Sequence, residues 1–275
     1  MKILSWIKAF RKKFGLAALV AAAFWILSFI ICMLADFVAP YPYELQDMQL
    51  GLSAPSLSHI FGTDMMGRDM FSRLLYGGRI SFLVGILATA VSIFIGVFYG
   101  MLSGMAGGKT DSAMMRIVDV IYSLPFTIFV IILTMAFGRS IWLIFVAIGA
   151  VEWLTMARIA RAMTLGLKTS QFVEASRAMG QSQTGIIIKH ILPNLAPAVV
   201  VCAALTIPGV MMLEAFLSFL GLGVQAPLPS LGSLIKDGAE CMEDAPWLLV
   251  FPALFFSALL YAINLIGEKL TDKKR

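Results

Sequence analysis

Few side chains in this sequence have a type and spacing that could support catalysis or metal binding. It contains no nucleophile elbow, no H-E-x-x-H zinc motif and no paired histidine–carboxylate signature. His59 and His190 have no third candidate ligand nearby. The cysteines are odd in number and unrelated in spacing, which favours neither a disulfide framework nor a metal site: Cys32, Cys202 and Cys241. We expect no catalytic centre, no metal site and no directly bound cofactor.

Two carboxylates stand in or beside long apolar runs, where a charge is costly and usually faces a bundle interior or water. Glu152, with the adjacent Trp153, is a candidate to line a solute pathway. The alternative is a structural ion pair between Glu152 and a basic residue such as Arg158 or Arg161. Asp119 is a second intramembrane polar candidate.

Two further features suggest contacts between helices. Gly96, Gly100 and Gly104 recur every four residues in "GVFYGMLSG", and such a ridge lets helix backbones approach closely in lipid. Glu214 interrupts a later apolar run near its outer end, where we expect an interhelical hydrogen bond. Ordinary glycine enrichment in membrane helices is the alternative for the ridge.

The composition is that of an integral membrane protein. Hydrophobic residues make up 60% of the 275 residues and charged residues only 13%, against about 45–50% and 25% in soluble domains. The net charge of +5 does not indicate nucleic-acid binding, because the basic residues cluster at the ends of apolar runs.

The apolar runs predict an all-α fold with six transmembrane helices, because a bilayer core needs about 20 apolar residues per helix. The expected spans are Phe14–Ala35, Ile80–Gly108, Val120–Gly138, Ile141–Ala157, Ile191–Phe219 and Ala245–Gly267. The first is expected to be a retained signal anchor, since its uncharged run is longer than a cleaved signal's apolar core of about 7–15 residues.

The distribution of lysine and arginine predicts that both termini lie in the cytoplasm. With that orientation sixteen of the 21 basic residues are inside and five outside, as the positive-inside rule requires. The predicted organisation has a tail, anchor helix and outer segment (1–79), a five-helix core (80–267) with a cytoplasmic loop (158–193), and a cytoplasmic tail (268–275).

The outer segment contains "GTDMMGRD". Asp64 and Asp69 lack the alternating oxygen ligands of a calcium loop. We expect instead a turn followed by a helix that Asp69 caps at its N-terminus, in contact with a binding protein or a partner subunit.

The cytoplasmic loop contains "EASRAMGQSQTGIIIKHILP" (174–193). Phe172, Ala175 and Met179 fall on one face of a short helix, and Gly180 is placed to end it in a left-handed conformation. From the residues alone, this helix could be a docking element, an interfacial helix or a solvated connection.

This stretch resembles the EAA motif of permease subunits in binding-protein-dependent ABC importers. Two positions depart from the pattern: Ser176 stands where a second alanine is usual, and His190 where isoleucine is usual. A histidine before "ILPN" is similar to the dipeptide, oligopeptide and nickel subfamily. The matching positions are Glu174, Ala175, Gly180, Leu192 and Pro193.

Three other stretches resemble the same subfamily: 61–85, 107–125 and 214–235. Together the resemblance covers about residues 55–267. The N-terminal anchor and long outer segment resemble the second of the two paralogous permeases in such systems.

The resemblance implies a type I ABC importer in the bacterial cytoplasmic membrane. This chain would pair with a paralogous permease, two cytoplasmic ATPases would use ATP and Mg²⁺, and an outer solute-binding protein would deliver the solute. The implied ATPase-coupling residues are Glu174, Ala175, Ser176, Arg177, Gly180, His190, Leu192 and Pro193. The chain itself lacks the G-x-x-x-x-G-K-[ST] phosphate-binding loop.

The expected function is import of oligopeptides or dipeptides by a non-catalytic subunit. Nickel or another metal complex is the alternative solute, and peptide is favoured by the stretches 107–125 and 214–235. A proton-coupled secondary transporter using Glu152 is a further alternative, which leaves the EAA match unexplained.

Overall fold

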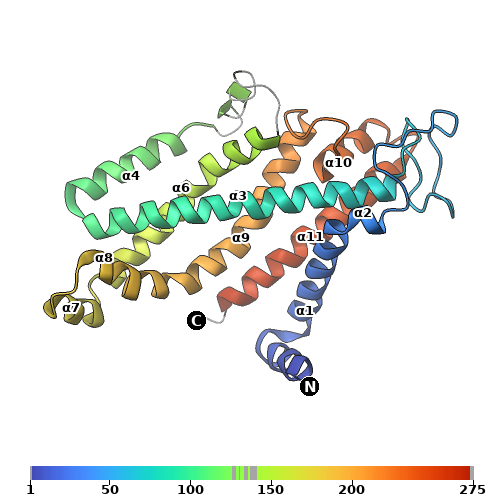
Figure 1. Ribbon diagram of the computed structural model, residues 1–275. Coiled ribbons are helices and arrows are strands. Elements are labelled where there is room, and N and C mark those ends of the chain that lie inside the picture. Colours follow the sequence, from blue (N-terminus) through green and yellow to red (C-terminus); the bar gives the residue numbers. More distant parts are fainter. Residues whose placement is uncertain (1, 126–127, 130, 133–135, 137–140, 273–275) are drawn as a thin grey trace.

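A computed structural model describes residues 2–125, 128–129, 131–132, 136 and 141–272, and they form an all-α protein (Figure 1). The helices are α1 (Lys2–Met33), α2 (Ala35–Val38), α3 (Met70–Ala106), α4 (Gly108–Tyr122), α6 (Ile141–Leu167), α7 (Gln171–Ala178), α8 (Gln183–Ile186), a π-helix (Ile187–Ile191), α9 (Leu192–Phe219), α10 (Leu231–Glu240) and α11 (Pro246–Asp272).

Four described helical stretches are long and apolar enough to cross a membrane: Gly15–Met33, Met70–Ala106, Gln183–Phe219 and Pro246–Thr271. They correspond to four of the expected spans. A fifth expected span coincides with the first part of α6. The expected span Val120–Gly138 falls largely outside the described residues, so only its start, at the end of α4, can be placed.

Helix α3 starts at Met70, directly after Asp69 and before the expected membrane span Ile80–Gly108. Asp69 has extended backbone angles, and its side chain accepts a hydrogen bond from the Ser72 N–H. This satisfies one of the free donors of the first helical turn. The expected cap at Asp69 is therefore confirmed, and the irregular outer segment ends at residue 69.

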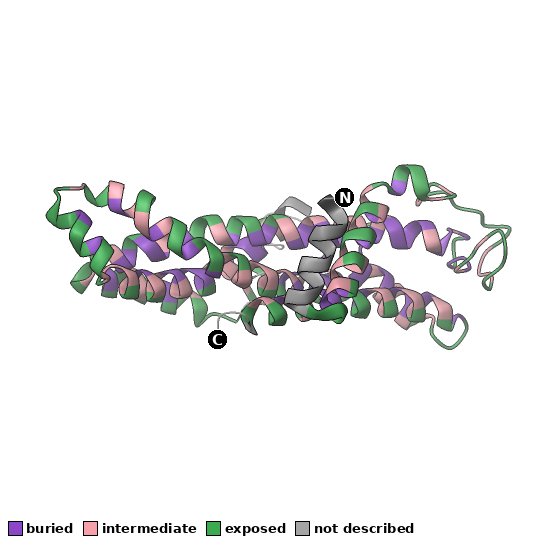
Figure 2. Ribbon diagram, turned by 90° about the horizontal axis from the view of Figure 1, so that it is seen from below, coloured by how far each residue is buried: buried purple, intermediate pink, exposed green. Residues whose placement is uncertain are grey.

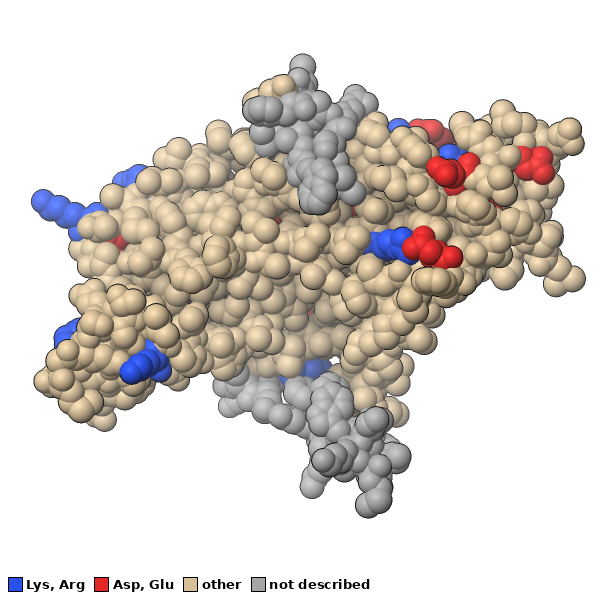
Figure 3. All heavy atoms as spheres, in the orientation of Figure 1, with Lys and Arg blue, Asp and Glu red and all other residues tan. Residues whose placement is uncertain are grey.

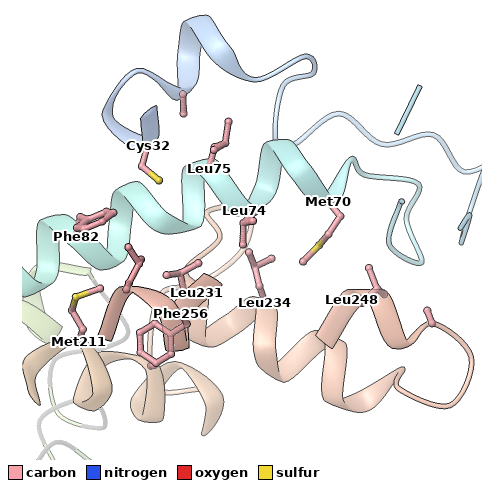
Figure 4. Packing of buried hydrophobic residues seen from close by; sticks show 14 residues of the cluster. Cys32, Met70, Leu74, Leu75, Phe82, Met211, Leu231, Leu234, Leu248 and Phe256 are labelled. Carbon is pink, nitrogen blue, oxygen red and sulfur yellow. The ribbon is translucent and has the colours of Figure 1, made fainter. Parts of the chain in front are cut away.

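Helix α3 runs through the middle of the molecule and contacts α1, α4, α6, α9 and α10 (Figure 1). More than half of its residues are buried, and Figure 2 shows buried and exposed residues alternating along the helices. The largest cluster of buried apolar residues joins α1, α3, α9, α10 and α11, as Figure 4 shows. Among its members are Cys32, Met70, Phe82, Met211, Leu231 and Phe256.

Residues 39–69 form an irregular structure without a regular helix or strand, as expected from their prolines and glycines. Its tight points are glycines: Gly67 has a φ of +70°, and a β-carbon there would lie 1.9 Å from the Asp47 carbonyl oxygen. Such a position excludes every other residue type.

The outer segment and α7 lie at opposite ends of the molecule (Figure 1). On the face drawn in Figure 3, basic side chains stand out at the α7 end and acidic ones are more frequent at the opposite end. The helix α10, inside the polar stretch 220–244, was not expected; a reciprocal capping box between Ser230 and Ser233 starts it.

Candidate coupling site and intramembrane polar residues

Helix α7 exposes an apolar face at one end of the molecule. Val173 and Ser176 are buried, whereas Phe172, Ala175 and Met179 are exposed, Met179 to 79%. These last three are the residues expected to share one face. Glu174 and Arg177 are exposed beside them. An ordered helix with an apolar outer face is typical of a surface that contacts a partner.

Gly180 ends α7 in a Schellman motif. Its φ is +81°, its N–H bonds to the Arg177 carbonyl at 3.0 Å, and the Gln181 N–H bonds to the Ser176 carbonyl at 3.1 Å. The expected left-handed end is confirmed. A β-carbon at residue 180 would meet no atom within 4 Å, so the backbone angle alone calls for glycine here.

The two positions that depart from the EAA pattern contact each other. Ser176 Oγ lies 3.1 Å from His190 Nε2, and His190 Nε2 lies 3.2 Å from Gln181 Oε1. Ser176 Oγ also donates to the Phe172 carbonyl at 2.8 Å. If His190 Nε2 carries the proton, it donates to both oxygens, and the set links α7 to the π-helix.

A π-helix lies directly before α9. At its end the Leu192 N–H bonds to the Ile187 carbonyl, five positions back instead of the usual four. Pro193, which has no N–H to donate, follows in the first turn of α9. Such insertions often mark functional sites in helices.

An apolar cluster ties α7 to the membrane helices. Val173 belongs to a cluster of buried residues drawn also from α3, α6, α8, the π-helix and α9, and the direct neighbour of α7 is α8. The other fully or nearly fully buried members are Val97, Met101, Met156, Ala160, Ile186, Ile191 and Leu195. This cluster connects α7, by way of α8, with α3, α6 and α9.

The three glycines at four-residue spacing lie where α3 approaches α6. A β-carbon would lie 2.6 Å from Met156 Cβ at Gly96, 2.3 Å from the Ala157 carbonyl at Gly100 and 2.8 Å from Thr164 Cβ at Gly104. Only glycine permits this backbone separation.

Glu152 does not pair with the arginines that were considered as its partners. Arg158 bonds to Asp119 at 2.9 Å, and Arg161 bonds to Asp111. An ion pair of Glu152 with Arg158 or Arg161 is therefore not formed, because each arginine pairs with a carboxylate of α4. Glu152 is half-buried and has no hydrogen-bond partner in the described part of the chain, and the ring of its neighbour Trp153 lies edge-on to Tyr99.

The pair Asp111–Arg161 was missed by the sequence interpretation. Arg161 donates from Nε and Nη2 to the two carboxylate oxygens at 2.5 and 2.6 Å, and Ser103 Oγ donates at 2.5 Å. The hydrogen bonds from Arg161 lower the pKa of Asp111 from 3.8 to about 2. The one local signal that could have indicated Asp111 is its place in the first turn of α4, where the helix dipole favours a negative charge.

Glu214 is fully buried and makes the expected interhelical hydrogen bond. Ser81 Oγ of α3 donates to its Oε2 at 2.8 Å, and Ser218 Oγ donates to its Oε1 at 2.7 Å. The carboxylate thus joins α3 and α9.

The acidic residues of the outer segment bind arginines and a histidine. Asp64 pairs with Arg68 at 2.7 Å and with Arg73 at 2.5 Å, and Asp69 accepts from His59 Nδ1 at 2.9 Å. Within the described ranges, no three His, Cys, Asp or Glu side chains are grouped closely enough to hold a metal ion.

This chain is similar to a family of transport proteins and to several named permeases. Residues 92–275 match the family described as the binding-protein-dependent transport system inner membrane component. The oligopeptide transport system permease protein OppC of Haemophilus influenzae is 48% identical over 96% of this chain and 84% of its own length. OppC of Escherichia coli is 49% identical over 93% and 85%. The dipeptide transport system permease protein DppC of Bacillus subtilis is 39% identical over 98% and 83%.

The fold is also found in a solved structure. Inward-facing MetNI, a methionine ABC transporter, contains a chain that superimposes with a TM-score of 0.62 at 21% identity, over 75% of this chain and 98% of that one. At that identity the likeness shows the fold alone. The chain is an all-α membrane protein with the permease fold of ABC importers, and it belongs to the family of binding-protein-dependent transport system inner membrane components.

Proposed function

We propose that this chain is a permease subunit of an ATP-driven importer for oligopeptides or dipeptides in the bacterial inner membrane. The observation that supports the solute class is the identity of nearly one half, over almost the whole chain, to permeases named for oligopeptide transport. The pathway forms together with a paralogous permease, and an outer binding protein delivers the peptide.

The coupling part of the proposal rests on α7. Its exposed apolar residues, Phe172, Ala175 and Met179, fit a groove on a cytoplasmic ATPase, and Glu174 and Arg177 flank that contact. Val173, on the buried side of α7, belongs to the same apolar cluster as Leu195 near the start of α9, so closure of the ATPases acts on the membrane helices through this cluster. A contact that differs between two states is what alternating access requires.

The remaining residues of the loop hold α7 in place. Gly180 ends the helix, Ser176 and His190 link it to the π-helix, and Leu192 and Pro193 begin α9. The ATPase subunits bind and hydrolyse ATP with Mg²⁺.

The proposal includes six transmembrane helices with both termini in the cytoplasm. Its domains are an N-terminal part (1–79), a five-helix core (80–267) with the cytoplasmic loop 158–193, and a C-terminal tail (268–275). Its support is the excess of basic residues on the proposed inner side. The half-buried Glu152, for which the described structure shows no ion pair, and Trp153 line the pathway. The exposed Asp119–Arg158 pair lies near its inner mouth.

The test is recovery of the ATPase subunits with purified Gly180→Trp. A side chain in the left-handed region costs about 1–2 kcal/mol, so the variant favours another backbone conformation at the end of α7. Docking requires the left-handed end and therefore has to overcome this cost, and about 1.4 kcal/mol corresponds to a tenfold change in the dissociation constant. No atom of the chain lies within 4 Å of the new β-carbon, so the subunit should insert normally. We expect recovery of the ATPases to fall about tenfold.

Gly51→Trp is the matched control. Gly51 also has a positive φ, +53°, and open space around it, but it lies in the outer segment. It should leave ATPase recovery unchanged. Equal recovery with Gly180→Trp and with the unaltered chain would refute docking through α7.

A further inference from the structure

Two hydrogen-bond relays connect the carboxylate of Glu214 to the first turn of α10. In the first, the Leu231 N–H donates to Ser81 Oγ at 3.3 Å, and Ser81 Oγ donates to Glu214 Oε2 at 2.8 Å. Ser81 belongs to α3, and all three residues are completely buried. A backbone donor of α10 is thereby satisfied through a membrane helix.

The second relay reaches the other carboxylate oxygen. The Ser233 N–H donates to Ser230 Oγ at 3.2 Å, Ser230 Oγ donates to Ser218 Oγ at 3.1 Å, and Ser218 Oγ donates to Glu214 Oε1 at 2.7 Å. Ser230 is the N-cap of α10, so the capping hydroxyl is itself held by α9.

Both oxygens of the Glu214 side chain take part in the relays. Each of the two serine hydroxyls next to it, Ser81 and Ser218, also lies within hydrogen-bond distance of a group on the α10 side. No polar atom of the completely buried Glu214 side chain is therefore left without a partner, as buried polar groups require.

The relays lie at the end of α9 that is farther from α7. Glu214 and Ser218 stand in the last turns of α9, the helix that begins at the coupling loop. Ser218 and Ser233 also line an outer pocket of about 350 Å³, together with Arg73 and Lys236. The outer end of α9 is therefore fixed to a surface helix by directed bonds as well as by apolar packing.

We propose that Glu214 is a positioning residue that fixes α10 to α9, so that movement of α9 changes the outer surface where the binding protein docks. This rests on the proposed function, in which ATPase closure moves α9 through α7. A buried hydrogen-bond network in which every member has a partner is rigid, so α10 follows α9 as one body.

The experiment uses the whole complex in lipid nanodiscs, with ATP hydrolysis measured as peptide-loaded binding protein is titrated. Glu214→Leu removes both acceptors at similar side-chain volume, and Ser230→Ala breaks the second relay outside the membrane helices. We expect the half-maximal concentration of binding protein to rise at least tenfold for Glu214→Leu and about threefold for Ser230→Ala. Hydrolysis without binding protein should stay within twofold.

Thr206→Val is the matched control, because this α9 hydroxyl bonds within its own helix to the Cys202 carbonyl at 2.9 Å. It should leave the titration unchanged. The double variant of Glu214 and Ser230 should behave like Glu214→Leu alone, since both changes act on one relay. Independent local damage would instead multiply the two effects.

The proposal is overturned if Ser230→Ala and Glu214→Leu titrate like Thr206→Val, or if their effects multiply. If Glu214→Leu does not assemble into the complex, the half-maximal concentrations of binding protein are compared for Ser230→Ala and Thr206→Val. A higher value for Ser230→Ala supports the proposal, and an equal value overturns it. Failure of the unaltered chain to bind ATPases at all would refute the proposed function instead.

Discussion

Gly100→Ala tests how strongly the close approach of α3 to α6 stabilises the bundle. The new β-carbon would lie 2.3 Å from the Ala157 carbonyl oxygen and 2.8 Å from Ala160 Cβ. Non-bonded contacts are most favourable near 3.5–4.0 Å, so the helices must separate by about 1 Å. The first of these neighbours is backbone, which cannot rotate away.

The expected loss of stability follows from two opposing terms. Overpacking costs about 1–3 kcal/mol, and here about 2–3 kcal/mol because the nearest neighbour is backbone, whereas alanine regains up to about 1 kcal/mol of helix propensity. The net loss of about 1–2 kcal/mol lowers the unfolding midpoint by roughly 2–8 °C for a chain of this size. The assay is thermal unfolding of the purified protein in a mild detergent, followed by intrinsic tryptophan fluorescence.

Matched glycines provide the controls. Gly209 in α9 and Gly166 in α6 have no atom within 4 Å of a would-be β-carbon, so alanine there should leave stability unchanged or raise it. Gly104→Ala meets the Thr164 side chain at 2.8 Å and should lower the midpoint less than Gly100→Ala does. If Gly100→Ala is as stable as Gly209→Ala, the close helix contact is not what the glycine ridge provides.

Two further predictions concern buried carboxylates outside the bilayer. Because Arg161 lowers the pKa of Asp111 to about 2, its stabilisation is full above about pH 4 and is lost as the pH falls toward 2. Asp111→Asn should therefore be less stable than the unaltered chain by about 1–2 kcal/mol at pH 7, a figure reduced for solvent screening because the Arg161 side chain is one-third exposed. The difference in unfolding free energy between the two proteins should narrow below pH 4. A constant difference from pH 7 to 3 would contradict this. Asp69→Ala removes a cap and leaves the donors of Ser72 and His59 unpaired, for a loss of about 2–3 kcal/mol, whereas Asp69→Asn keeps an acceptor and should lose less. Limited proteolysis at the exposed Leu57 compares the two, and equal protection of both variants would show that the cap is not needed.

Local signals in the sequence predicted what depends on a few neighbouring residues. The apolar runs located four of the long helices, Asp69 indicated the start of α3, and Gly180 indicated the end of α7. Each of these features is determined by hydropathy or by backbone preference within one turn. The helix α10 lay in a polar stretch whose composition gave no such signal, although its capping serines are visible once the helix is known.

Pairings between distant residues could not be predicted in this way. Arg161 and Asp111 are 50 residues apart, and Ser81 and Glu214 are 133 apart. The positions of α3, α4, α6 and α9 decide these contacts. Glu152 illustrates the difficulty, because two arginines close to it in sequence bind carboxylates of α4 instead.

The two positions that depart from the EAA pattern, in the loop 158–193, are a further pairing that could not be predicted from the sequence. Taken separately, Ser176 and His190 each put a polar group where an apolar residue is usual. In the structure they form one contact at 3.1 Å, and Gln181 supplies a further polar partner. Ser176 lies on the buried side of α7, so its hydroxyl would be costly without hydrogen-bond partners. A directed bond between α7 and the π-helix restricts the angle between them more than contact of two apolar side chains would. We infer that in this chain the orientation of α7 relative to α9 depends on hydrogen bonds of His190, and that Ser176 and His190 have to be considered as one unit in any substitution.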